Sequence, residues 1–163
     1  MSAQALPLPG RAPSLRLAST LDAAAIARHR RLMFDEMGLA SGGALERVEQ
    51  ETRAAVEHAM IEGYYRHWFA VEDGQIIAGA GVIVARWLPM PDEPALARAT
   101  VLNVYTEPPF RNRGLARRLM LAVIDWCRAQ ELASVQLHSS DAGRPLYEAL
   151  GFKATNEMRL TLR

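Results

Sequence analysis

Residues 100–126 constrain the fold of this chain more than any other stretch. They begin with TVLNVYT, a run of apolar and β-branched residues that predicts a strand. Pro108 and Pro109 then remove backbone donors and hold the chain in an extended turn. The chain continues into RNRGLARRLM, a cation-rich turn that leads into an amphipathic helix. This order predicts a phosphate site, because the first N–H groups of a helix have no partner within it.

Two short motifs lie in and after this stretch. Arg111, Gly114 and Ala116 fit the pattern (Gln/Arg)-x-x-Gly-x-(Gly/Ala), and the segment GRPLYEALGF at 143–152 contains a match to LYxxLGF. In this order and at this separation, the motifs resemble the acetyl-CoA signature of the GCN5-related N-acetyltransferase (GNAT) family. Within residues 100–152 the resemblance rests on specific motifs. Before residue 100 it concerns only the general architecture.

Composition narrows the class of protein. The chain has 163 residues, 50% of them hydrophobic, which is enough for one domain with a sizeable core. The net charge of +1 gives no overall attraction to nucleic acid. A single cysteine excludes an internal disulfide and favours a reducing compartment. We therefore expect a cytoplasmic protein without nucleic-acid or membrane partners, with a flexible tail over residues 1–13 and a single domain over 14–163.

Strand and helix patterns alternate along the rest of the chain. Thr20 is the expected N-cap of the first helix, whose residues 29–31 are expected on its solvated side. Asp73 and Gly74 predict a tight hairpin turn, and the small residues 78–81 after it indicate a close approach of backbone or a bulge in the returning strand. The predicted strands cover residues 15–18, 68–72, 75–87, 100–106, 135–138 and 158–162, and the predicted helices cover residues 20–37, 45–60, 114–130 and 144–150.

The helix after the turn has an apolar stripe that predicts its buried face. The expected stripe consists of Leu115, Leu119, Ala122, Val123 and Trp126. Cys127 falls beside this stripe with no His–Asp pattern near it, so we interpret it as a packing residue and not as a catalytic thiol.

The element order predicts a mixed α/β (α+β) fold with helices on both faces of the sheet. The resemblance makes this more specific. It implies a GNAT-like, mostly antiparallel sheet of about six to seven strands, in which two strands splay apart at the acetyl-CoA site.

The resemblance also implies the cofactor site. Acetyl-CoA is the expected co-substrate, and no metal pattern is found. Backbone N–H groups of the turn and helix start would bind the pyrophosphate, with the arginines assisting. The pantetheine amides would pair with the central strand as an added strand does. The implied cofactor-binding residues are Val104, Tyr105, Thr106, Arg111, Asn112, Arg113, Gly114, Leu115, Ala116, Arg117 and Ser140.

Direct transfer of an acetyl group requires oxyanion donors, an acid for the sulfur and a route for the amine proton. Tyr147 matches the tyrosine that serves as this acid in the family, and a backbone N–H near Val104 or Tyr105 would face the oxyanion. Many relatives carry a glutamate base in the strand after the cofactor helix, and the nearest equivalent in this chain is Gln136, which cannot accept the proton. Glu107 and His138 are the candidate bases, and Asp141, a water chain or an amine that arrives neutral are the alternatives.

The acceptor side is defined less sharply. In the family, the first two helices and the loop between them wall the acceptor site, which makes Tyr64, Tyr65 and His67 candidate contacts alongside ordinary packing roles. Trp87 is a further candidate, and Asp92 and Glu93 lie in a proline-rich loop that could form the rim. We expect a small-molecule or peptide amine as acceptor and consider a homodimer as the oligomeric state.

Two other functions remain open at this point. A CoA-binding regulatory module would keep the cofactor site without turnover, and the missing glutamate favours it. A nucleotide-phosphate enzyme would use the same strand, turn and helix, but GxGxxG and GxxxxGK[ST] are both absent from the sequence.

Overall fold

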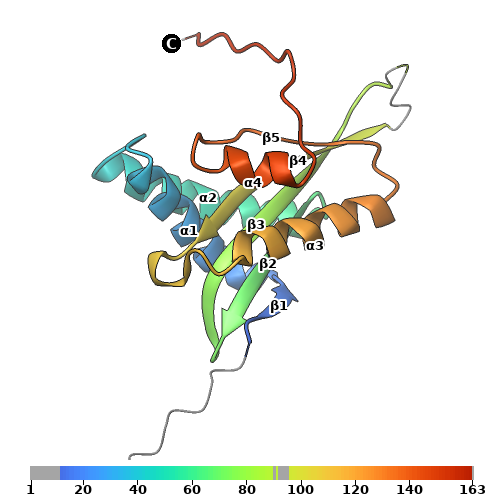
Figure 1. Ribbon diagram of the computed structural model, residues 1–163. Coiled ribbons are helices and arrows are strands. Elements are labelled where there is room, and N and C mark those ends of the chain that lie inside the picture. Colours follow the sequence, from blue (N-terminus) through green and yellow to red (C-terminus); the bar gives the residue numbers. More distant parts are fainter. Residues whose placement is uncertain (1–11, 90, 92–95, 163) are drawn as a thin grey trace, which may run out of the picture.

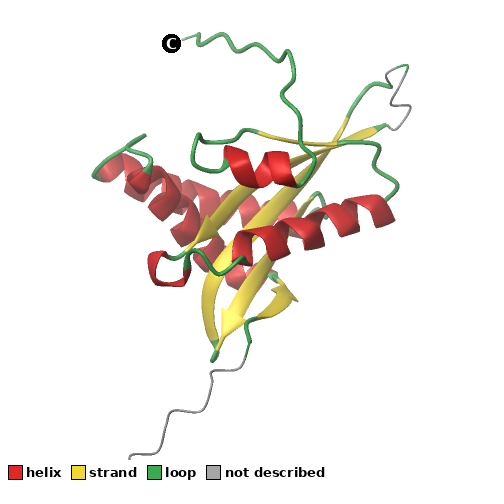
Figure 2. Ribbon diagram, viewed as in Figure 1, coloured by secondary structure: helices red, strands yellow, loops and turns green. Residues whose placement is uncertain are grey.

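The computed structural model describes residues 12–89, 91 and 96–162, and within them five strands form one mixed sheet in the order β1-β2-β3-β4-β5 (Figure 2). Strands β1 to β4 are antiparallel to their neighbours, and β4 and β5 are parallel. The strands are β1 (Ser14–Leu17), β2 (Tyr65–Glu72), β3 (Gln75–Arg86), β4 (Ala97–Thr106) and β5 (Val135–Leu137).

Helices cover both faces of this sheet. Helices α1 and α2 lie behind it in Figure 1, and α3 and α4 lie in front. The expected mixed fold with helices on both faces is thus confirmed, and the 3₁₀ turns η1 and η2 precede α1 and α3. The bounds are η1 (Thr20–Asp22), α1 (Ala23–Glu36), α2 (Gly43–Ile61), η2 (Pro108–Phe110), α3 (Leu115–Ala129) and α4 (Arg144–Ala149).

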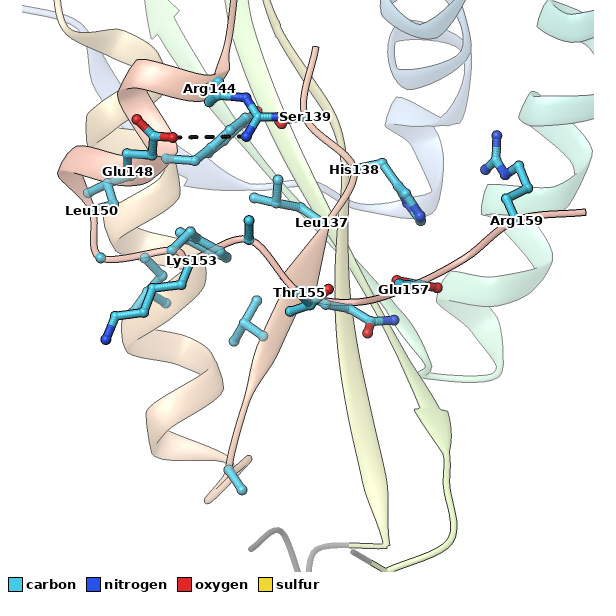
Figure 3. A pocket seen from close by; sticks show the side chains of 18 of the residues that line it. Leu137, His138, Ser139, Arg144, Glu148, Leu150, Lys153, Thr155, Glu157 and Arg159 are labelled. Carbon is cyan, nitrogen blue, oxygen red and sulfur yellow. Dashed lines mark ion pairs between the residues drawn. The ribbon is translucent and has the colours of Figure 1, made fainter. Parts of the chain in front are cut away.

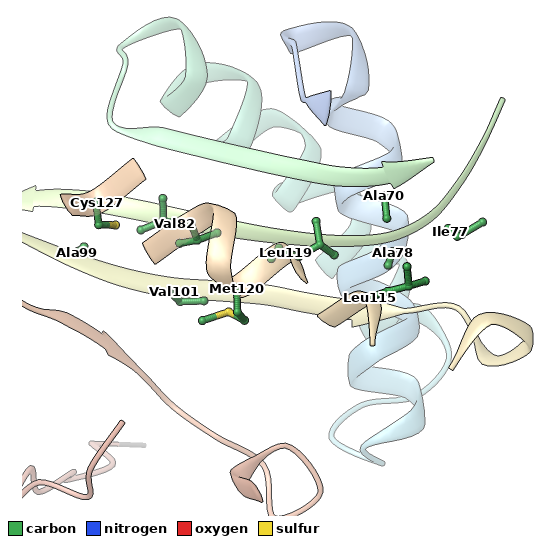
Figure 4. Packing of buried hydrophobic residues seen from close by; sticks show 12 residues of the cluster. Ala70, Ile77, Ala78, Val82, Ala99, Val101, Leu115, Leu119, Met120 and Cys127 are labelled. Carbon is green, nitrogen blue, oxygen red and sulfur yellow. The ribbon is translucent and has the colours of Figure 1, made fainter. Parts of the chain in front are cut away.

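The helix α3 packs on the sheet through a stripe that differs from the predicted one. Ala122 and Trp126 are only partly buried, whereas Met120 and Cys127 are fully buried. Burial raises the pKa of the Cys127 thiol to about 11, which suits a packing role. Figure 4 shows this layer, in which α3 side chains meet the small side chains of the strands. The labelled residues are Ala70, Ile77, Ala78, Val82, Ala99, Val101, Leu115, Leu119, Met120 and Cys127.

The layer between the sheet and helices α1 and α2 is more polar than expected. The prediction of a solvated side for residues 29–31 is wrong, because His29 is buried and Arg30 is half-buried against β4. The N-cap predicted at Thr20 is also wrong. Thr20 is the first residue of η1, whose N-cap is Ser19 with its N–H bonded to Asp22 Oδ2 at 2.8 Å, and the N-cap of α1 is Asp22.

A bulge interrupts β4 next to two glycines of β3. Gly79 opposes Tyr105 and Gly81 opposes Leu102, so that one residue of β3 faces two of β4. The extra residue, Asn103, has a left-handed φ of +56°. The expected close approach at the β3 glycines is confirmed, because a Cβ on either one would overlap a buried ring of β2.

The bulge absorbs the extra residue without changing the pattern of the strand. Val101 and Val104 both pack on the α3 side, while Leu102 and Asn103 both face the α1 side. Tyr105 then returns to the α1 side, where its hydroxyl donates to Glu36 Oε1 at 2.7 Å.

The described residues contain fewer strands than the six to seven expected. The predicted strand over 158–162 is wrong, since Met158, Leu160 and Leu162 are 94%, 81% and 86% exposed and join no strand of the sheet. This segment runs away from the domain in Figure 1. Alternation of apolar residues predicts a strand, but a strand also needs an edge to pair with.

Two expectations lie outside the described residues. The tail over residues 1–13 is described only from residue 12, and Asp92 and Glu93 are not described.

Candidate functional site

The turn between η2 and α3 presents a row of unsatisfied backbone donors. Asn112 and Gly114 have left-handed φ values of +60° and +71°, which bring successive N–H groups to one side of the chain. The first bond of the helix runs from the N–H of Arg118 to the carbonyl of Gly114, at 3.1 Å. Among the described residues, the N–H groups of residues 112–117 have no backbone acceptor. This row at the positive end of α3 is suited to an anion such as phosphate.

Most arginines around this turn hold it in place. Arg113 makes two hydrogen bonds to the Glu72 carboxylate, at 3.0 and 2.5 Å. Arg111 bonds Glu36 Oε2 at 2.5 Å and the Thr106 carbonyl at 3.0 Å. The side chains of Arg111 and Arg113 thus anchor the turn to β2, β4 and α1. The Arg113 N–H belongs to the free row, whereas the Arg111 N–H donates to the Pro108 carbonyl at 3.3 Å.

Two arginines follow in the first turn of α3. Arg118 donates to the carbonyl of Pro13 at 2.9 Å, whereas the side chain of the exposed Arg117 has no hydrogen-bond or ion-pair partner within the described part of the chain. Arg117 is therefore the cation of this helix that is open to a phosphate. Leu115 is buried and Ala116 is partly buried, so these two residues offer only backbone donors.

The pairing of β4 with β5 ends before this turn, and the unpaired interval between the two strands is named the β4–β5 cleft. The parallel pairing ends where Val101 meets Leu137, although β4 continues to Thr106. The bulge at Asn103 follows immediately, and a bulge bends and twists its strand. The splayed strands that the resemblance implied are therefore present.

The backbone donors of β4 beyond the bulge divide between its two edges. The Glu107 N–H donates to the Ile77 carbonyl of β3 at 2.9 Å. Since backbone groups alternate along an extended strand, the Tyr105 N–H also faces β3, while those of Val104 and Thr106 face the cleft. Of the two expected oxyanion donors, Val104 is the one on the cleft side.

The side of the cleft beyond β5 is walled by α4. Tyr147 packs edge-on against Phe152, with ring centroids 5.9 Å apart, and burial raises the pKa of its hydroxyl. Ser140 sits at the start of this wall, where its hydroxyl accepts the Gly143 N–H at 3.2 Å. A groove continues from here between β5, α4 and residues 153–159, as Figure 3 shows. Gly151 ends α4 with a φ of +94°, as a C-terminal glycine does.

The two candidate bases have different surroundings. Glu107 contacts Arg28 at 2.5 Å and His29 Nε2 at 3.4 Å, and the Arg28 guanidinium holds the pKa of this carboxyl below its usual range. His138 is exposed at the end of β5 and lines the groove with Tyr147. Gln136 donates to the hydroxyl of Thr100 at 2.9 Å and joins the two strands.

The candidate acceptor contacts are dispersed. Tyr65 and His67 are buried in β2, Tyr64 is 40% exposed beside His58, and Trp87 is 49% exposed beneath Arg98. The β3–β4 register places Trp87 at the end of the sheet opposite the turn.

Sequence reasoning missed one polar group at the centre of the sheet. Asn103 accepts from Arg30 at 2.6 Å and donates to the Tyr65 hydroxyl at 3.1 Å. The signal was an asparagine within an otherwise apolar strand, since asparagine is rare in strands and tolerates positive φ.

Comparison with known proteins identifies the family. The model of the acetyltransferase (GNAT) family matches residues 25–152. The chain belongs to the GNAT family. It is therefore an acyltransferase with acetyl-CoA as co-substrate, as the two sequence motifs predicted. No curated protein sequence matches the chain.

Solved GNAT structures share this fold over nearly the whole chain. A GCN5-related N-acetyltransferase from Ralstonia eutropha JMP134 is 30% identical with a TM-score of 0.86, covering 92% of this chain and 98% of its own. A predicted acetyltransferase from Clostridium acetobutylicum, solved with acetyl-CoA, is 23% identical with a TM-score of 0.85, covering 92% and 96%. An aminoglycoside N-acetyltransferase in complex with CoA is 17% identical with a TM-score of 0.70, covering 98% and 99%.

Two further site types find no support in the described residues. Their histidine, cysteine and acidic side chains form no group that could hold a metal ion. No described helix has the length and apolar character needed to cross a bilayer.

Proposed function

We propose that this GNAT protein transfers the acetyl group of acetyl-CoA directly to a primary amine. The main support is the row of free N–H groups at residues 112–117 beside an open edge of β4. The pyrophosphate would bind this row, with Arg117 close by, and the pantetheine amides would pair with the backbone of Val104 and Thr106.

The chemistry then needs a donor for the oxyanion and an acid for the sulfur. The amine attacks the thioester carbonyl, and the oxyanion of the tetrahedral intermediate accepts the Val104 N–H. As the intermediate collapses, the carbon–sulfur bond breaks and the thiolate takes the proton of the Tyr147 hydroxyl. The raised pKa of Tyr147 keeps that hydroxyl protonated until the thiolate forms.

The amine proton requires an acceptor, and we favour His138 over Glu107. A lowered pKa makes the Glu107 carboxylate a weaker base, and Arg28 and His29 already occupy it. Replacing His138 with alanine should lower kcat and shift the pH profile, whereas Glu107→Gln should act mainly on stability. A pH profile that only Glu107→Gln changes would reverse this assignment.

Amino sugars belong in the first set of acceptors. Structural relatives include an aminoglycoside N-acetyltransferase and a glucosamine-6-phosphate N-acetyltransferase from Arabidopsis thaliana, at 17% and 16% identity. Both names describe acceptors that carry an amine on a sugar. Tyr64 and Trp87 are the exposed aromatic candidates for acceptor contact.

The test begins with acetyl-CoA binding by calorimetry, followed by thiol release against amino sugars, polyamines, amino acids and peptides. Binding together with release for one acceptor class supports the proposal. Binding without release from any amine would favour the regulatory CoA-binding module, and absence of binding would refute the cofactor site.

We further propose that the chain forms a homodimer through its C-terminal segment. Met158, Leu160 and Leu162 alternate along it and are exposed, and β5 pairs on one edge only among the described strands. A second copy of this segment would offer that edge a strand with its apolar residues on one face. Light scattering should give a dimer, and Leu160→Arg should give a monomer. A monomeric native chain would refute this proposal.

A further inference from the structure

A directed chain of hydrogen bonds crosses the layer between α1 and the sheet. Arg30 has only donors, so its 2.6 Å bond requires the Asn103 oxygen to face it. The amide nitrogen of Asn103 must then face the Tyr65 hydroxyl, to which it donates at 3.1 Å. The side-chain orientation of Asn103 is thereby fixed from both ends.

The chain continues to a histidine. Burial raises the pKa of Tyr65 and lowers that of His67 to about 3, so the hydroxyl is protonated and the imidazole is neutral. The Tyr65 hydroxyl can therefore donate to His67 Nδ1, which lies 2.9 Å away. Tyr65 and His67 are 2% and 0% exposed, so water does not compete for these bonds.

The residue at the centre of this chain is also the residue that forms the bulge. Asparagine tolerates a left-handed φ better than most residues, but a side chain without partners would leave the bulge free to straighten. Pairing of β4 with β5 stops at Val101, two residues before Asn103. If β4 were straight, the alternation of its backbone groups would turn the Val104 N–H toward β3. A longer part of the β4 edge could then pair with β5.

We propose that Asn103 is a positioning residue for acetyl transfer. Its side chain, held by Arg30 and Tyr65, maintains the bulge in β4. This bulge opens the β4–β5 cleft and turns the Val104 N–H into it. The inference rests on the proposed function and adds to it a group that touches neither acetyl-CoA nor the amine. It also assigns a role to this chain of buried hydrogen-bonded side chains, because burying polar groups costs free energy that apolar side chains in the same layer would not cost.

The test separates the backbone conformation of residue 103 from the hydrogen bonds of its side chain. Asn103→Gly keeps the left-handed conformation accessible but removes both hydrogen bonds, and Tyr65→Phe removes only the hydroxyl. We expect Asn103→Gly to lower kcat about tenfold while the acetyl-CoA dissociation constant rises less, by about twofold to threefold, because the pantetheine contact at Thr106 remains whereas the oxyanion contact at Val104 is lost in the transition state. Tyr65→Phe should lower kcat less, and should add nothing in the Asn103→Gly background.

The control is Glu131→Gly, which makes the same kind of change at an exposed left-handed residue after α3, where φ is +55°. It should leave kcat at the native value. Native kcat in Asn103→Gly would overturn the proposal, as would a fall in kcat matched by an equal loss of acetyl-CoA affinity. If Asn103→Gly does not fold, Tyr65→Phe decides by the same split between kcat and affinity.

A second measurement does not depend on turnover. The amide resonance of Val104 should differ between the acetyl-CoA and CoA complexes of the native protein, and this difference should disappear in Asn103→Gly. If it appears and depends on Asn103 while no amine is acetylated, positioning stands and the transfer proposal fails. If amines are acetylated but the Val104 resonance does not respond to the acetyl group, this inference fails and the transferase stands.

Discussion

Replacing Gly81 with alanine should destabilise the protein by an amount that its surroundings define. A Cβ at this position would lie 2.8 Å from His67 Nδ1 and from Tyr65 Cζ, and closer still to the Tyr65 hydroxyl. These atoms belong to rings that are almost fully buried, so they cannot swing into solvent. The strand must shift, or the bond between Tyr65 and His67 must break.

The cost has two parts. Overpacking a core costs about 1–3 kcal/mol, and losing one buried hydrogen bond costs about 1 kcal/mol more. We therefore expect a loss of about 2–4 kcal/mol in the free energy of unfolding. In a domain of this size, about 2–4 °C of Tm follows each kcal/mol, so Tm should fall by roughly 5–15 °C.

Thermal and urea denaturation measure this loss, and Gly43→Ala is the matched control. At Gly43, in the first turn of α2, the nearest atom to a Cβ is Arg47 Nη1 at 3.8 Å, so alanine should be neutral or stabilising. Tyr65→Phe should relieve part of the Gly81→Ala defect by removing the closest atom. A Tm for Gly81→Ala within about 1 °C of the native value would refute the close packing on which this reasoning depends.

Three further predictions test the site and the charge pairs. Gly114→Trp should abolish acetyl-CoA binding in calorimetry, because a bulky side chain at a φ of +71° both strains the turn and fills the anion site; unchanged binding would remove this turn from the cofactor site. Tyr147→Phe should lower kcat about 100-fold with little change in CoA affinity, and a native kcat would make Tyr147 a packing residue. Asp22→Asn should cost about 1 kcal/mol at pH 7, because it removes a partly exposed pair with Arg16. Since this pair lowers the folded pKa of Asp22 to about 2, its contribution is present above about pH 4 and is lost as pH falls toward 2. Denaturation at pH 7 and near pH 2 should show that difference, while the exposed pair of Asp125 should give none in Asp125→Asn.

The sequence predicted best where one local pattern determines the structure. The turn before α3, the Asp73–Gly74 hairpin and the helix of 144–150 each carry their own glycine or proline signals. The family motifs also predicted acetyl-CoA as the co-substrate, which the family membership confirms.

Prediction failed where distant residues decide the outcome. The polar residues of α1 read as a solvated face, because nothing local reveals that Arg30 meets an asparagine of β4. Glu107 stays a candidate base, but nothing local to it in the sequence predicts the Arg28 guanidinium against its carboxylate. The strand expected at 158–162 needs the edge of a sheet to pair with, and within the described part of the chain this segment pairs with no strand.

The alternation of side chains along β4 has a consequence for how such a chain can evolve. Because Leu102 and Asn103 face the same side, a chain that lacked Asn103 would keep Val101 and Val104 in one core and Tyr105 in the other. A regular strand and a strand with an open edge thus differ by one inserted residue, with no change in either core. A single-residue insertion at this point of β4 can therefore arise without repacking either side of the sheet.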